Sequence, residues 1–99
     1  MIRFHRIADR ELRDARRYYR HRSAVAALNF AMEVNEALLR LAASPEMCDL
    51  VEDGYRRIHL HTFPYHVIFE MKARDQFLIV AVPHDRRRPE YWRRRVSSN

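Results

Sequence analysis

The stretch FLIVAV, Phe77 to Val82, is apolar at every one of its positions. A strand with one solvated face alternates apolar and polar residues, whereas an unbroken apolar run is typical of a strand that is central in its sheet or buried on both faces. Such a strand requires neighbours on both edges and a covering layer. In a chain of 99 residues, most of the remaining sequence must supply them.

Alternating patterns predict three further strands. Met1 to Arg6 alternates apolar with basic residues and is expected to form a short, half-buried strand. Tyr55 to His61 and Tyr65 to Met71 are expected to form two more strands, and Lys72 to Asp75 is expected to form a polar hairpin turn. Pro45 to Asp53 is expected to be a loop with one helical turn at most.

Two helical patterns lie between the first strand and the others. Asp9 is a plausible N-cap for a helix from Arg10 to about Arg22, and Ser23 can cap a second helix that ends near Ala43. The short link makes the pair an antiparallel hairpin. The second helix carries an apolar stripe, formed by Ala27, Phe30, Ala31, Val34, Leu38 and Leu41. Its opposite face is expected to be wet, with Asn29, Glu33, Glu36 and Arg40.

The predicted order is β-α-α-β-β-β, which places the chain in the α+β class. The last three strands form an antiparallel meander in a small twisted sheet. The N-terminal strand is expected beside the last strand, which would make Phe77 to Val82 central and face it toward Phe30, Val34, Leu38 and Leu41. The helical hairpin must cover one face of the sheet. Residues 1–99 are expected to form a single domain.

The chain is strongly basic, with a formal charge of +6, and Lys72 is its only lysine beside 18 arginines. Arginine binds phosphates and carboxylates in a bidentate manner, so an acidic partner is expected, either nucleic acid or an acidic protein segment. The single cysteine, Cys48, excludes an internal disulfide. No apolar run is long enough for a signal peptide or a membrane span, which indicates a cytoplasmic protein.

The C-terminal stretch from His84 to Arg95 contains six arginines around one proline and the only tryptophan. A disordered basic tail would not need Pro89, Tyr91 and Trp92. We therefore expect an ordered end that presents arginines from the edge of the sheet. Trp92 is expected to be a packing anchor rather than a stacking platform for bases.

Three histidines, His59, His61 and His66, raise the question of a metal site. No acidic or cysteine ligand falls within this motif, and structural zinc sites usually need four ligands. A solvated or cross-strand basic face is favoured. No metal and no cofactor are therefore expected.

Two phrases at a fixed spacing resemble a known family. FPYHVIF, Phe63 to Phe69, looks like an "F-P-Y, then apolar strand" signature, and HDRRRPEYW, His84 to Trp92, looks like a "His, basic run, Pro, then Trp" ending. With the helical hairpin before them, they resemble the RelE/ParE toxins of bacterial type II toxin–antitoxin modules. The resemblance covers nearly the whole chain.

The resemblance implies a cytoplasmic toxin, of the kind associated with plasmid stabilization, that a cognate antitoxin binds and neutralises. The antitoxin is expected to contribute an acidic amphipathic segment. ParE-like members of the family poison DNA gyrase and have no established catalytic residues, whereas RelE-like members cleave mRNA in the ribosomal A site. The FPY signature and the Pro-x-x-Trp ending favour the ParE-like branch.

Site residues follow from these alternatives. An RNase of the RelE type needs a base, an acid and cations for the phosphorane charge. The residues implied for it are His84, Arg56, Arg86 and Tyr91, with Glu52 and Glu70 as other candidate bases. Under either activity the residues expected to contact the target are Arg56, His84, Arg86, Arg87, Arg88 and Arg93. A non-toxic nucleic-acid-binding module remains a third interpretation of the same basic surface.

Overall fold

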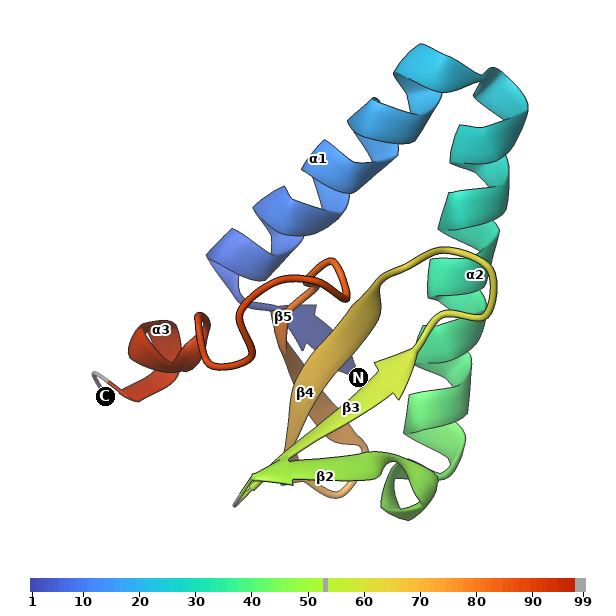
Figure 1. Ribbon diagram of the computed structural model, residues 1–99. Helices are drawn as coiled ribbons and strands as arrows, with labels where there is room; N and C mark the ends of the chain where they lie inside the picture. The colour runs from blue at the N-terminus through green and yellow to red at the C-terminus, as the bar shows by residue number, and fades with distance from the viewer. Residues whose placement is uncertain (53, 98–99) are drawn as a thin grey trace.

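A computed structural model of the chain describes residues 1–52 and 54–97. It is an α+β fold with a five-stranded mixed sheet in the order β1-β5-β4-β3-β2 (Figure 1). The strands are β1 (Ile2–Phe4), β2 (Asp49–Glu52), β3 (Tyr55–His59), β4 (His66–Ala73) and β5 (Gln76–Ala81). The fold class predicted from the sequence is confirmed.

The strand pairing agrees with the prediction, and only the identity of the middle strand differs. β1 runs parallel to β5, with Ile2 opposite Phe77, and β3, β4 and β5 form the expected antiparallel meander. The meander turns at Arg74 and Asp75, and Asp75 takes a positive φ of 61°. Phe77 to Ala81 lie in β5, an interior strand with β1 and β4 on its two edges as expected, although β2 extends the far edge and makes β4 the middle strand of the five.

The segment Pro45 to Asp53 was expected to be a loop with one helical turn at most; the turn is present, but the loop assignment was wrong for Asp49–Glu52, which form a strand. A 3-10 turn, η1 (Pro45–Met47), leads directly into β2, which pairs antiparallel with β3. Asp49 lies opposite Arg57 and Leu50 lies opposite Arg56. Asp53 lies outside the described residues. The strand is short and its pairing irregular, so it carries little periodic signal.

The helical hairpin consists of α1 (Arg6–Arg22) and α2 (Ala24–Ala43). Ser23 caps α2 as expected, since its hydroxyl accepts from the Ala26 N–H at 3.1 Å. The predicted N-cap Asp9 was wrong, because α1 begins earlier and His5 caps it through Nδ1, which accepts from the Ile7 N–H at 3.0 Å. The longer helix buries Ala8 in phase with Leu12 and Ala15 on the inner face.

The two faces of the sheet are covered by different parts of the chain. On one face, Ala8 of α1 and Leu41 of α2 pack with Phe69, Phe77 and Ile79. On the other face, the C-terminal segment and α3 (Arg93–Ser97) pack over the sheet. Its buried cluster is Ile68, Val80, Ala81 and Trp92. Both faces of β5 are therefore buried, as its unbroken apolar run predicts.

Packing of α2 differs from the expectation in two ways. Phe30 and Val34 pack with Leu60 and the partly buried Phe63 and Tyr65 rather than with β5. The helix that mainly contacts β5 is α1, whereas α2 mainly contacts β3 (Figure 1). The face expected to be wet also carries an exposed apolar stripe. Its members are Val25, Leu28, Met32 and Leu39, which are 60–66% exposed.

Within residues 1–52 and 54–97, no helix has the length and apolar character that crossing a bilayer would require.

Candidate functional site

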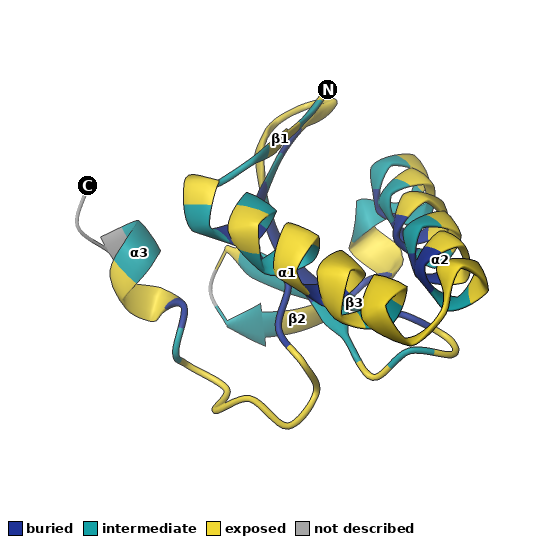
Figure 2. Ribbon diagram, turned by 90° about the horizontal axis from the view of Figure 1, so that it is seen from above, coloured by how far each residue is buried: buried dark blue, intermediate teal, exposed yellow. Residues whose placement is uncertain are grey.

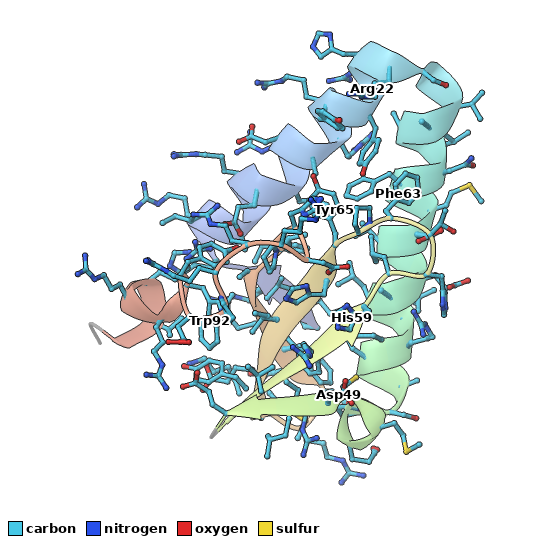
Figure 3. All side chains as sticks on the ribbon, in the orientation of Figure 1. Arg22, Asp49, His59, Phe63, Tyr65 and Trp92 are labelled. Atoms are coloured by element: carbon cyan, nitrogen blue, oxygen red, sulfur yellow. The ribbon has the colours of Figure 1, made fainter. Side chains whose placement is uncertain are left out.

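The C-terminal segment is fastened to the sheet by Trp92. Its side chain is fully buried beside Ile68 and Val80, and its ring lies 5.0 Å from that of Tyr55 (Figure 3). This is the position that a packing anchor would occupy. The residues that flank Trp92 are therefore held near the sheet rather than released into solvent.

Glu11 of α1 is a second residue that holds the C-terminal segment against the rest of the fold. Its Oε1 accepts hydrogen bonds from the Val82 N–H at 3.0 Å and from Arg95 Nη1 at 3.1 Å. Its Oε2 accepts from Arg95 Nη2 at 3.1 Å and from the Tyr91 hydroxyl at 2.8 Å. Arg95 also donates to the Val80 carbonyl oxygen at 3.1 Å. One carboxylate thus joins α1, the end of β5 and the C-terminal segment.

Between β5 and these fastenings, the chain forms an exposed turn that carries Arg86, Arg87 and Arg88 (Figure 2). The Arg87 guanidinium lies over the Tyr91 ring, 4.0 Å from its centroid. A stacked guanidinium keeps its N–H edge free to bind an anion. The turn therefore presents a group of cations on a fixed base.

Arg56 and His84 both lie toward the helical side of the sheet. Arg56 Nη1 donates to the Cys48 carbonyl oxygen at 2.8 Å. His84 forms an isolated bridge with Tyr65, and the two rings are 5.2 Å apart. Its Nδ1 accepts from the Arg86 N–H at 3.1 Å, so His84 supports the arginine turn.

Other candidate residues are engaged with different partners. The Tyr91 hydroxyl donates to Glu11, and burial together with this hydrogen bond raises the pKa of Tyr91 far above its usual value. Arg93 binds the Glu52 carboxylate, with Nε donating to Oε2 at 2.9 Å. Glu70 pairs with Lys72 at 3.1 Å. Of the four residues implied for RNA cleavage, His84 and Arg86 are joined by a hydrogen bond, whereas Arg56 is bonded to Cys48 and Tyr91 to Glu11.

A different cluster lies where β3 and β4 begin to separate. His59 and His66 are paired across the two strands, and their ring centroids are 4.9 Å apart. Asp85 Oδ1 lies 2.8 Å from His66 Nδ1 and 3.5 Å from His59 Nδ1. Burial lowers the pKa of His66, although the hydrogen bond to Asp85 acts in the opposite direction. His61 stands apart, 3.7 Å from Glu36.

The comparison with known families decides the identity of the fold. Residues 2–89 match the family model described as ParE toxin of the type II toxin–antitoxin system, parDE. The chain belongs to the ParE toxin family. No curated protein matches the sequence with significance. As a ParE-family toxin, the protein has a cognate antitoxin as its expected partner, in agreement with the resemblance seen in the sequence.

The family match covers part of the surface described above for this ParE-family toxin and omits the rest. It covers the arginine turn and the histidine–aspartate cluster, but it ends at Pro89, before Trp92 and Arg95. The fastening of the C-terminal segment is therefore a feature of this chain that the family match does not describe.

Two features of this ParE-family toxin were missed by the sequence-based analysis. Glu11 was not predicted to hold the C-terminal segment, although it lies on the inner side of α1 between Ala8 and Ala15. A carboxylate in that position needs a partner, and this signal was available. Asp85 was not connected with His59 and His66, because the contact joins residues 19 positions apart and depends on strand register.

Proposed function

We propose that this ParE-family toxin acts in the cytoplasm by inhibiting DNA gyrase, and that the turn Arg86 to Arg88 contacts the target. Family membership supports the toxin role. The exposure of the three arginines supports a binding surface, since adjacent guanidiniums form bidentate contacts with phosphates or carboxylates. Arg56 of β3 and His84, which is bridged to Tyr65, are proposed to contact the target as well.

A binding mechanism is favoured by one observation. Two of the groups implied for RNA cleavage are bonded to residues outside the set, Arg56 to Cys48 and Tyr91 to Glu11, while His84 and Arg86 are bonded to each other. General acid–base catalysis requires its groups within hydrogen-bond reach of a common substrate position. Arg93, which binds Glu52, would first have to leave this carboxylate to contact a target.

RelE-like cleavage of mRNA is the second candidate, and one observation favours it. His59 and His66 are close together, and the positive charge of Arg57 acts on His66. Two imidazoles beside a cation are the kinds of group that RNA cleavage needs. They are, however, not the residues that the sequence analysis implied.

Two assays on induced cells and purified protein separate these activities. We expect inhibition of gyrase supercoiling without new mRNA ends on translating ribosomes. His84→Gln should change gyrase inhibition only modestly. If the protein instead cleaves mRNA and His84 is its acid or base, the same change should slow cleavage by about 10²–10⁴-fold. Ribosome-dependent cleavage without any effect on gyrase would overturn the proposal.

The surface proposed for the antitoxin is the exposed stripe of α2. Val25, Leu28, Met32 and Leu39 follow helical spacing on one side of α2. The antitoxin's expected acidic amphipathic segment could bury these side chains while its carboxylates meet the arginines of α1. Association should be fast and should slow as salt increases.

A double variant tests this surface. Leu28→Glu with Met32→Glu should weaken the complex on co-expression with the antitoxin, because charges would be buried in an apolar contact. The fold should persist, because the Leu28 and Met32 side chains are 60% and 61% exposed and are not part of the core. Met47→Glu, at a site 80% exposed outside the stripe, is the matched control. A double variant that co-purifies as well as this control would contradict the assignment.

A further inference from the structure

We propose that His59, His66 and Asp85 form a binding site for a first-row divalent metal ion such as Zn²⁺. No metal was expected from the sequence, because the histidine motif contains no acidic ligand. The fold supplies that ligand from the turn after β5. One ligand atom from each of the three residues lies within 4.8 Å of the other two.

The separations suit a metal ion. With metal–ligand bonds of about 2.0–2.1 Å, neighbouring ligand atoms lie roughly 2.9–3.4 Å apart in octahedral or tetrahedral geometry. Asp85 Oδ1 is 2.8 Å from His66 Nδ1 and 3.5 Å from His59 Nδ1. Small side-chain rotations would therefore place all three atoms around one ion.

The backbone already holds the ligands in place. His59 and His66 are paired in the register of β3 and β4. The Asp85 N–H donates to the Pro64 carbonyl oxygen at 2.8 Å, and the His66 N–H donates to the Pro83 carbonyl oxygen at 3.1 Å. The three ligand-bearing segments are thus joined before any ion binds, so little ordering remains to oppose binding.

The ligand chemistry selects the class of ion. Two imidazoles and one carboxylate suit Zn²⁺, Ni²⁺, Cu²⁺ or Fe²⁺, whereas Mg²⁺ prefers oxygen ligands alone. Three protein ligands leave positions for water. The positive charge of Arg57 acts on His66 and would repel a cation, and Asp49, 3.9 Å from Arg57, offsets part of this repulsion. A bound ion would also fix Asp85, and with it the start of the arginine turn.

The test uses untagged protein, freed of metal by a chelator, and Zn²⁺ in competition with a chromophoric chelator. We expect one Zn²⁺ per chain and a higher thermal midpoint in its presence, with no effect of Mg²⁺ at the same concentration. His59→Ala and Asp85→Asn each remove a ligand from a partly exposed site. Each should weaken binding by more than the roughly 10–100-fold that loss of an outer-sphere partner costs.

His61→Ala is the matched control, because it removes a histidine that also lies near a carboxylate, Glu36, but outside the cluster. This variant should bind Zn²⁺ as the unaltered chain does. Co²⁺ gives a second readout, since its visible absorption should appear with the intact protein and not with Asp85→Asn. The proposal would be overturned if the unaltered chain bound Zn²⁺ no more tightly than His59→Ala does. It would also be overturned if His61→Ala lost as much affinity for Zn²⁺ as His59→Ala. None of these readouts depends on whether gyrase is the target.

Discussion

At the scale of single residues, one carboxylate carries an unusual share of the contacts between distant segments. Glu11 accepts hydrogen bonds from the Val82 N–H just after β5, from Tyr91 and from both terminal nitrogens of Arg95. The Glu11 and Arg95 side chains are only 18% and 9% exposed, so solvent screens their interaction weakly. The pair therefore differs in kind from the surface ion pairs of α1.

Glu11→Gln should lower the free energy of unfolding by about 3 kcal/mol, because it leaves a largely buried guanidinium without its counter-charge. Thermal or denaturant unfolding of the two proteins measures this difference. Asp9→Asn is the control on the same helix. Its pair with Arg13 is exposed, so the change should cost less than about 1 kcal/mol. Equal effects of the two substitutions would show that Glu11 is not the fastening described here.

Single residues also show how far sequence reasoning reached. The burial of Trp92 and the exposure of Arg86 to Arg88 follow from their chemistry, since an indole gains from burial and three adjacent guanidiniums resist it. The meeting of Asp85 with His66 does not follow in this way. It depends on the register between β4 and the end of β5, which local patterns do not specify.

At the scale of elements, the strong periodic patterns predicted the right structures and the weak ones did not. The core-facing stripe of α2 and the unbroken apolar run of β5 are long enough for their burial to be recognised from the sequence. β2 has only four residues and lies at the edge of the sheet, with β3 as its neighbouring strand. Its strand character therefore comes from pairing with β3 rather than from its own sequence. The early start of α1 comes from a histidine cap, which is uncommon.

The core of β5 provides a test at this scale. Ile79→Ala should lower the free energy of unfolding by about 2–4 kcal/mol, because its fully buried side chain packs between the helical hairpin and the sheet. A small domain has only about 5–15 kcal/mol of stability, so toxicity should fall together with the folded fraction. Chemical denaturation measures the loss. Leu78→Ala, at a partly buried position on the opposite face of the same strand, should cost less, and a reversed order would contradict the packing.

At the scale of the whole molecule, the two faces of the sheet are covered by different segments of the chain. The helical hairpin covers one face and leaves an apolar stripe on its outer side, which fits the antitoxin expected of a ParE-family toxin. The C-terminal segment covers the other face and holds the arginine turn at its margin. The scaffold and the proposed target surface are thus separate, since the turn contributes little to the core.

That separation has a direct consequence for a variant with Arg86, Arg87 and Arg88 all replaced by alanine. Its thermal midpoint should fall by no more than a few degrees, because the main packing lost is that of Arg87 on Tyr91, worth about 0.5–1 kcal/mol. Trp92→Ala should behave in the opposite way, losing about 3–5 kcal/mol of stability with the buried indole. Differential scanning calorimetry compares the two.

The most direct measurement is gyrase supercoiling by purified enzyme, with the toxin titrated as the unaltered chain and as R86A/R87A/R88A. We predict that the unaltered chain inhibits and that the triple variant is weaker by on the order of 100-fold or more, since each charge-assisted contact is worth about 1.5–3 kcal/mol. R10A/R16A/R20A removes the same charge from the exposed face of α1 and should inhibit normally. A folded triple variant as potent as the unaltered chain would contradict the account.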